Sequence, residues 1–207
     1  MEFLSEQRDV LTDLLKWRRD VRHFKTDPID EGLLENLRNV MELSPSVGNS
    51  RPWRVIRVKN PNLRVEVKTI FERCNQAAAN EYDDETRSEY LQLKLAGLDR
   101  APEHLAVFTD IDPEEGRGLG RQTMAETLQQ STAMAVHTLW LAARAENLGL
   151  GMISILDRKA IENLFDCPPN WRFSAYLCIG WPESQDDTPL LHRTNWQENT
   201  KTQWIEK

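Results

Sequence analysis

The stretch that organises this chain is Arg18-Arg19-Asp20-Val21-Arg22, which places three guanidinium groups and one carboxylate within five consecutive residues. Guanidinium groups bind phosphate oxygens two at a time, so arginine-rich turns are typical of phosphate-binding sites. The same pattern also occurs at a solvated helix end, where the arginines pair with nearby Asp and Glu. The stretch therefore indicates either an oxyanion site or a charged surface.

The positive charge of this stretch is local, because the 207-residue chain carries a net charge of −7 and has a pI near 5.2. Binding to nucleic acid or to an anionic membrane requires a basic face, so neither partner is expected. A chain of this length normally folds around one full hydrophobic core. We therefore expect residues 1–207 to form a single domain.

The cysteines and histidines exclude several classes of site. The cysteines are odd in number and have no CxxC spacing, which indicates neither a disulfide framework nor a zinc site. The four histidines lie at separations that no metal-binding helix motif uses, so no metal site is expected. No apolar run approaches the roughly 20 residues of a membrane span, and the N-terminus has no export signal. We therefore expect a cytoplasmic protein with reduced thiols.

Common catalytic motifs are missing from the sequence. It contains no GxSxG, P-loop or HExxH motif, which excludes the common hydrolase and NTPase classes. The glycine-rich stretch 116–120 resembles a dinucleotide fingerprint, but only one residue separates its second and third glycines, where GxGxxG needs two. Any redox chemistry must therefore come from a bound cofactor.

Apolar periodicity predicts helices separated by short strands. Helical spacing favours helices over 5–17 with Ser5 as the cap, between a start signal at 27–30 and a stop at Ser44-Pro45, over about 63–79 and 123–148, and from an Asp157 cap to Phe165. Runs of β-branched and aromatic residues predict strands over 53–59, 104–109, 152–156 and 173–180. This pattern allows either an α/β or an α+β fold.

Two further segments have more than one interpretation. The loop 44–52 is bracketed by Pro45 and Pro52, and its serines and Gly48 suit a close approach to a ligand but are also ordinary loop residues. The leucine-rich segment 90–98 could cover a buried ligand or pack on the core as an ordinary helix.

Taken together, these stretches resemble a known family. Its motifs are residues 18–22, the loop Ser44-Pro45-Ser46-Val47-Gly48-Asn49-Ser50-Arg51-Pro52-Trp53, and the stretches 101–108, 116–124 and 151–157. The combination resembles the FMN-dependent nitroreductase family and, within it, the branch of the 5,6-dimethylbenzimidazole synthases. The resemblance runs from about Trp17 to Trp196.

The resemblance implies an α+β, nitroreductase-like fold, with a mixed, mainly antiparallel sheet flanked by helices in an intertwined homodimer. The flavin would lie at the interface between the subunits. The tail 189–207 would dock on the partner subunit, and residues of about 82–100, which include the leucine-rich segment, could form a lid over the ligand.

The resemblance also implies a reaction, in which reduced FMN serves as both cofactor and substrate. Molecular oxygen would fragment it to 5,6-dimethylbenzimidazole, the lower ligand of vitamin B12, and a separate flavin reductase would supply the reduced FMN. Asp20 and Ser154 match the catalytic positions, where a carboxylate and a hydroxyl can move protons. The cofactor-binding positions are Arg18, Arg19, Asp20, Val21, Arg22, Ser46, Asn49, Leu95, Gly151, Met152, Ser154 and Arg193.

One departure from the branch leaves two alternatives open. Asn49 and Arg51 add a polar and a charged group where the branch has an apolar or aromatic residue and a glutamine. The first alternative is a nitroreductase or flavin reductase that uses NAD(P)H, and the second is a flavin-binding protein without catalytic activity.

Overall fold

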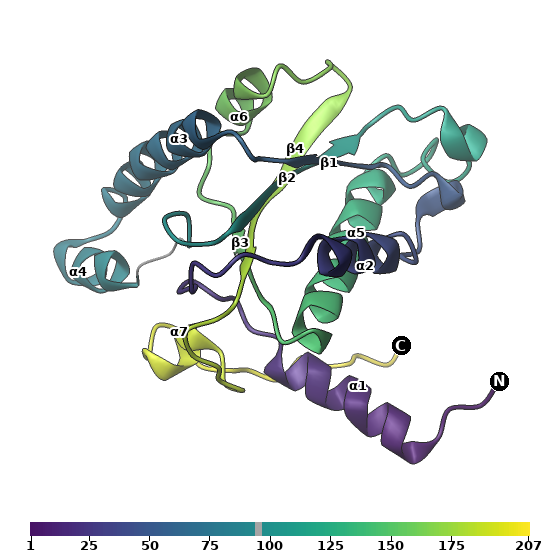
Figure 1. Cartoon of the computed structure of the whole chain (residues 1–207), viewed down its shortest axis with the longest axis horizontal. Helices are drawn as coiled ribbons and strands as arrows, with labels where there is room; N and C mark the ends of the chain where they lie inside the picture. Colours follow the sequence, from purple (N-terminus) through teal and green to yellow (C-terminus); the bar gives the residue numbers. More distant parts are fainter. Residues whose placement is uncertain (94–96) are drawn as a thin grey trace.

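The computed structural model describes residues 1–93 and 97–207, and within them the chain forms an antiparallel sheet with the strand order β1-β2-β4-β3 (Figure 1). The strands are β1 (Trp53–Arg57), β2 (Glu103–Asp110), β3 (Gly149–Ile153) and β4 (Trp171–Gly180). All three strand pairs are antiparallel. β1 and β3 therefore form the two edges of the sheet.

The arginine-rich stretch adds a short parallel contact to the β3 edge. Asp20 forms a parallel bridge with Leu150, and the Val21 N–H donates to the Leu150 carbonyl at 3.1 Å. A Cβ atom at Gly151 would lie only 2.2 Å from the Val21 carbonyl oxygen, so this close approach requires glycine. The named strands therefore pair antiparallel, and this isolated bridge is a parallel contact between the arginine-rich stretch and the edge of the sheet.

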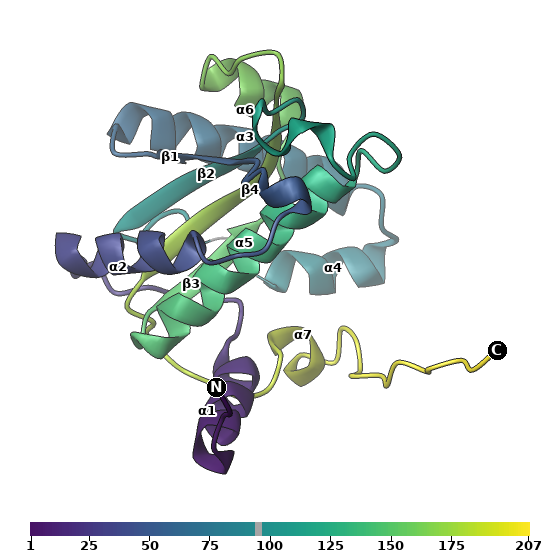
Figure 2. The ribbon, with the colours of Figure 1, turned by 90° about the vertical axis from the view of Figure 1, so that its right-hand side faces the viewer.

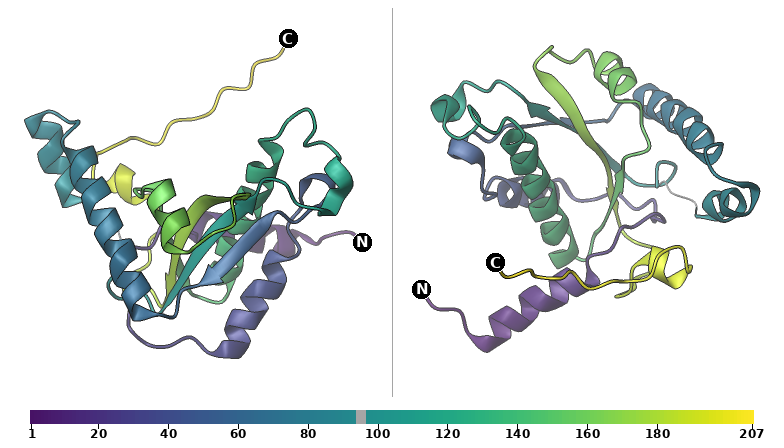
Figure 3. Two further views of the ribbon diagram at one scale, coloured as in Figure 1. Left: turned by 90° about the horizontal axis from the view of Figure 1, so that it is seen from above. Right: turned by 180° about the vertical axis from the view of Figure 1, so that it is seen from behind.

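Helices cover both faces of the sheet (Figures 2 and 3). One face packs against α2 (Glu31–Met41) and α5 (Thr127–Ala145), and the other against α3 (Pro61–Ala79) and α6 (Arg158–Leu164). The side chains of a strand alternate between these two clusters: Leu177 joins the α2/α5 cluster, and Tyr176 and Cys178 join the α3/α6 cluster. The remaining helices are α1 (Ser5–Trp17), α4 (Asp84–Gln92) and α7 (Leu190–Arg193), with short 3₁₀ turns at η1 (Val47–Asn49) and η2 (Glu115–Gly118).

Three predicted element boundaries were wrong. Ser5 is the first residue of α1 and not its cap, since Leu4 takes the N-cap position and its N–H donates to Gln7 Oε1 at 2.9 Å. The third strand spans 149–153 and not 152–156, because its glycines accept the close contact with residues 20–21. The helix expected over 123–148 begins at Thr127 and ends at Ala145. The predicted Asp157 cap is confirmed, since its Oδ1 accepts from the Ala160 N–H at 2.9 Å.

Candidate functional site

The Asp20 carboxylate is fixed at the β3 edge by two contacts. Its Oδ1 accepts a hydrogen bond from the Met152 N–H at 3.0 Å, and its Oδ2 lies 2.9 Å from Arg22 Nε. The backbone bridge to Leu150 holds the residue from the other side. The fold thus brings together five of the predicted cofactor-binding residues, which are Asp20, Val21, Arg22, Gly151 and Met152.

Arg18 lies beside this carboxylate but has a different environment. Its guanidinium carbon lies 4.8 Å from the centre of the Trp140 ring. Its Nε is buried and has no hydrogen-bond partner within residues 1–93 and 97–207. Burial, and then the charge of Arg19, lower the pKa of Arg18. A buried donor without a partner is costly, so this group is suited to bind an anion.

Arg18 and Met152 line one cavity of about 420 Å³ between α5 and the strands β3 and β4, which we call the Arg18 cavity. The side chains of His137, Trp140 and Arg158 also line it. Among its described lining residues there is no Asp or Glu. Its volume falls within the roughly 300–1,000 Å³ of small-molecule sites. Basic and aromatic walls without a carboxylate suit an anion that carries a flat apolar group.

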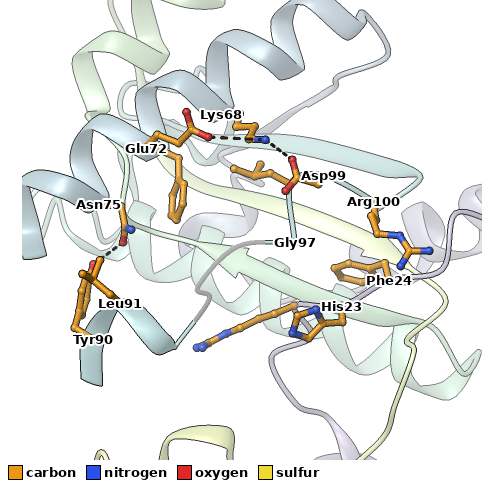
Figure 4. Close-up of a pocket in the computed structure, with 13 residues that line it drawn as sticks. His23, Phe24, Lys68, Glu72, Asn75, Tyr90, Leu91, Gly97, Asp99 and Arg100 are labelled. Carbon is orange, nitrogen blue, oxygen red and sulfur yellow. Dashed lines mark hydrogen bonds and ion pairs between the residues drawn. The ribbon is translucent and has the colours of Figure 1, made fainter. Parts of the chain in front are cut away.

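Arg22 faces a second cavity, of about 360 Å³, between α3, α4 and residues 97–100, which we call the Arg22 cavity (Figure 4). Arg22 Nη1 donates to the Leu93 carbonyl at 3.1 Å, at the C-terminal end of α4. Other polar groups of this cavity pair with one another: Lys68 with Asp99 at 2.6 Å, and the Tyr90 hydroxyl with Asn75 at 2.8 Å. Arg18 and Arg22 therefore serve two different cavities, on either side of Asp20.

The other two predicted arginines contact the C-terminal segment. Arg19 donates from Nε to the Asp187 carbonyl at 3.1 Å and also donates to the Lys16 carbonyl. Arg193, at the end of α7, lies 3.2 Å from Asp186. Both guanidiniums are thus held by neighbouring parts of the same segment, residues 186–187.

Ser46 and Asn49 lie away from the arginine-rich stretch. The Ser46 hydroxyl accepts from the Arg51 N–H at 3.0 Å, and the Val47 N–H donates to Ser131 Oγ at 3.0 Å, near the start of α5. Trp140 follows Ser131 by nine positions (140 − 131) on this helix, which is roughly 13 Å at about 1.5 Å per residue. The Ser46 loop contacts Ser131 and Arg18 contacts Trp140, so Ser46 and Arg18 of one chain do not contact the same ligand phosphate.

Two predicted residues remain separate from the cavities. Ser154 is exposed and follows directly after β3, and it lines neither the Arg18 cavity nor the Arg22 cavity as described. Leu95, which was expected to bind the cofactor, lies outside the described residues.

The departure at residues 49–51 has a local structural explanation. Asn49 and Arg51 adopt positive φ angles of 54° and 44°, which are unfavourable for residues other than glycine. The Arg51 guanidinium lies 3.5 Å from Glu42, which also accepts from the Trp53 ring N–H at 3.2 Å. The additional positive charge is therefore paired within this chain.

Sequence reasoning missed two aromatic features of the site. Trp140 lies on an apolar helix, and from sequence it resembles any other core residue. Trp196 packs against the aromatic rings of Tyr82 and Tyr90 in its own chain, with ring centres 5.8 and 6.2 Å away. Trp196 thus packs on Tyr82 and on α4 of its own chain, and a docking of the remaining tail on a partner stays a prediction.

Metal clusters and membrane-spanning helices are both absent from the described residues. Within 1–93 and 97–207, no group of three or more His, Cys, Asp and Glu side chains could hold a metal ion. Among the helices of the same ranges, none is both long and apolar enough to cross a membrane.

The sequence is similar to characterised enzymes over nearly its whole length. It is 61% identical to a 5,6-dimethylbenzimidazole synthase of Rhodobacter capsulatus over 204 residues, which cover 99% of each chain. It is 50% identical to a 5,6-dimethylbenzimidazole synthase of Rhodospirillum rubrum, over 92% of this chain and 90% of the relative.

The fold is also similar to solved structures. An iodotyrosine deiodinase bound to FMN and 3-iodo-L-tyrosine superimposes with a TM-score of 0.72 at 22% identity, over 95% of this chain and 97% of that one. The family model described as the nitroreductase family matches residues 15–181, which include both the arginine-rich stretch and the whole sheet. The expected fold is therefore confirmed, and the chain belongs to the nitroreductase family.

Proposed function

We propose that this protein is a 5,6-dimethylbenzimidazole synthase, an enzyme that uses molecular oxygen to fragment reduced FMN to the lower ligand of vitamin B12. The carrying observation is the Asp20 carboxylate, fixed by Met152 and Arg22 beside a basic cavity in which Arg18 Nε has no partner among the described residues. The sequence identity of 50–61% to enzymes of this name supports the assignment.

The residues of the Arg18 cavity fit FMN. Arg18 Nε, which has no partner among the described residues, could donate to a phosphate, and Met152 and Phe173 offer apolar surface to the rest of the molecule. When bound, reduced FMN would supply the electrons for the reaction with oxygen and would itself be cleaved. Arg19 and Arg193, both near residues 186–187, would add positive charge on the side of the C-terminal segment.

Asp20 and Ser154 would carry the proton transfers. Arg22 Nε and the Met152 N–H hold the Asp20 carboxylate in one position, and a fixed carboxylate beside the flavin could accept a proton during the oxidation. Ser154 follows β3 by one residue and is exposed, so its hydroxyl is available to donate or relay a proton. A separate flavin reductase would supply reduced FMN, and the three free cysteines suit the reducing cytoplasm.

We further propose that residues 1–207 form one domain that works as an intertwined homodimer. α1 buries none of its residues within the chain, and Val10, Leu11 and Met134 are 58, 51 and 41% exposed. Such unburied apolar helix faces are typical of interfaces. A second copy could also bring its own Ser46 and Asn49 to the flavin that Arg18 binds.

Two truncations test the dimer and the role of the tail. Removal of residues after Pro189 takes away the Trp196 contact with the lid segment as well as Trp204, so an aggregating or flavin-free protein is expected. Removal of residues 200–207 takes away only exposed apolar groups, Trp204 at 95% and Ile205 at 79%. If both truncated chains were well-behaved, flavin-loaded monomers by light scattering, the dimer proposal would be wrong.

The reaction itself can be tested directly. The purified protein is mixed with chemically reduced FMN, exposed to air, and the products are identified by mass spectrometry, with boiled protein as the control. We expect 5,6-dimethylbenzimidazole, and slow oxidation of NADH and NADPH, because the lid segment 82–100 would restrict access of a nicotinamide to the flavin. Rapid, saturable NAD(P)H oxidation without formation of the benzimidazole would favour the nitroreductase alternative. Flavin binding without any turnover would favour the alternative of a non-catalytic flavin-binding protein.

A further inference from the structure

We infer that Trp140 is a positioning residue that holds the Arg18 guanidinium ready for the phosphate of FMN, and that the protein thereby distinguishes FMN from flavins without a phosphate. The inference rests on the proposed flavin site. It comes from the two contacts that the Trp140 ring makes with consecutive residues of the arginine-rich stretch.

The Trp140 ring is itself well anchored. It projects from α5 and packs, half-buried, against the cluster that fills the α2/α5 face of the sheet. Its ring N–H donates to the Arg19 carbonyl at 3.3 Å, and the Arg18 guanidinium carbon lies 4.8 Å from the ring centre. One side chain of the core thus fixes both the backbone and the charged group of residues 18–19.

The ring is also the contact that orients Arg18. The nearest acid along the chain, Asp20, is engaged by Arg22 and by the Met152 N–H. Arg18 Nε has no hydrogen-bond partner within the described ranges, and no acidic side chain is among the described residues that line the Arg18 cavity. The attraction to the aromatic face therefore substitutes for an ion pair.

This arrangement has a chemical advantage over an ion pair. A carboxylate partner would neutralise the guanidinium and occupy some of its five N–H donors, whereas an aromatic face attracts the cation through the ring quadrupole and leaves the donors free. An arginine loses much rotamer freedom when it binds a ligand. Because the contact with the Trp140 ring already restricts the Arg18 side chain, the binding of phosphate costs less side-chain entropy.

The test compares the affinities for FMN and for riboflavin, which has the same ring and side chain but no phosphate. Trp140→Leu leaves a smaller apolar side chain but removes the aromatic face and the N–H bond to Arg19, so FMN should bind about 5- to 20-fold more weakly. Riboflavin should change by less than about twofold, because it does not need Arg18. Trp140→Phe keeps an aromatic face and should restore most of the FMN affinity.

Trp181→Leu is the matched control. Trp181 packs against the same cluster and its ring N–H donates to the Pro28 carbonyl at 3.4 Å, but it is not in contact with Arg18 in the described structure. Its replacement should leave the ratio of FMN to riboflavin affinity unchanged. Combining Trp140→Leu with Arg18→Gln should cost no more FMN affinity than Arg18→Gln alone, if the ring acts through Arg18.

Three results would overturn the inference. FMN affinity that is unchanged in Trp140→Leu would show that the ring does not position Arg18. An equal loss for FMN and riboflavin would show a general structural role. If the wild-type protein bound neither flavin, the proposed function would fail and this inference with it; the first two results leave the proposed function intact.

Discussion

The two edges of the sheet each present an arginine, but in opposite electrostatic environments. At the β1 edge, Arg57 is bidentate to Glu31 and to Glu103, with all four N–O distances between 2.7 and 2.9 Å. Hydrogen bonds to Glu103 and then Glu31 raise the pKa of Arg57, whereas burial lowers the pKa of Arg18 at the β3 edge. Arg57 has its donors satisfied by the protein, and Arg18 keeps donors for a ligand.

This difference separates a role in stability from a role in binding. Paired charges at the β1 edge tie α2 to the strands β1 and β2. The β3 edge is instead joined by residues 18–22, from which Arg22 contacts the Leu93 carbonyl and Arg19 the Asp187 carbonyl. Substitutions at the β1 edge should therefore change the stability of the fold, and those at the β3 edge should change flavin binding or turnover.

The largest expected effect is on turnover, at Asp20. Asp20→Asn keeps an oxygen for the Met152 N–H but removes the negative charge, so FMN should remain bound while the rate of benzimidazole formation falls by roughly 10²- to 10⁴-fold. Ser154→Gly should likewise keep the flavin and lose product. The rates are measured with reduced FMN in air.

Asp110→Asn is the matched control for Asp20. Asp110 is buried, and its carboxylate accepts from Arg54 at 2.9 Å and from Asn170 at 2.8 Å, away from both cavities. This substitution should lower the free energy of unfolding by about 1–3 kcal/mol with little effect on the rate. A full rate in Asp20→Asn, or the same loss in both variants, would contradict the distinction between the regions.

The sequence predicted most of the fold because periodicity and turn residues report local structure. The strand of residues 149–153 was misplaced by its glycines, which are weak strand formers but fit against Val21, a contact that is distant in sequence. Family resemblance, and not periodicity, distinguished α+β from α/β.

The candidate site was predicted only in part. Asp20, Gly151 and Met152 were expected at the flavin and do lie together. The different surroundings of Arg18 and Arg22 could not be read from the sequence, because two arginines four positions apart carry the same charge and differ only in their tertiary contacts. Trp140 was not predicted at the site either, because its contact with Arg18 is also a tertiary contact that the apolar pattern of α5 does not reveal.

The second prediction concerns the strands between the two edges. His104 is buried, its Nδ1 lies 3.0 Å from the Tyr176 hydroxyl, and burial, followed by the charge of Arg64, lowers the pKa of His104 to about 4. Between pH 6.5 and about 4 the unfolded chain takes up a proton that the folded chain does not. The free energy of unfolding therefore keeps this contribution above pH 6.5. It falls by on the order of 3 kcal/mol as the pH is lowered toward 4.

Urea unfolding at a series of pH values measures this loss. His104→Gln should be less stable than the wild type at pH 7 but should show a shallower decline between pH 6.5 and 4. The same decline in both proteins would show that other groups are responsible.

The third prediction compares the arginines directly. Arg18→Gln removes charge-assisted hydrogen bonds worth about 1.5–3 kcal/mol each, so FMN should bind roughly 10- to 100-fold more weakly. Arg22 lines the other cavity and is held by Asp20 and the Leu93 carbonyl, so Arg22→Ala should weaken FMN binding less, through the lost support of Asp20. Arg57→Gln should leave FMN affinity unchanged and lower the free energy of unfolding, because it leaves Glu103, which is only 12% exposed, without its partner. Equal FMN affinity in Arg18→Gln, Arg22→Ala and the wild type would refute a phosphate site at the β3 edge.

The smallest expected effect tests how the β3 edge is covered. Trp196 meets Tyr82 and Tyr90 edge-on or tilted, and the Tyr90 hydroxyl bonds to Asn75 of α3. Each aromatic pair contributes about 0.5–1.5 kcal/mol, so Trp196→Ala should increase the opening of α4 by about 3- to 10-fold. Amide hydrogen exchange over residues 84–92 measures this opening, with Trp204→Ala, an exposed tryptophan, as the control. On the proposal that α4 closes over the flavin, oxygen would reach the ring and a nicotinamide would not, so Trp196→Ala should also raise NADH oxidation by a similar factor. Faster exchange without faster NADH oxidation would show that α4 does not limit access to the flavin, whereas unchanged exchange would show that the aromatic cluster does not hold the lid segment.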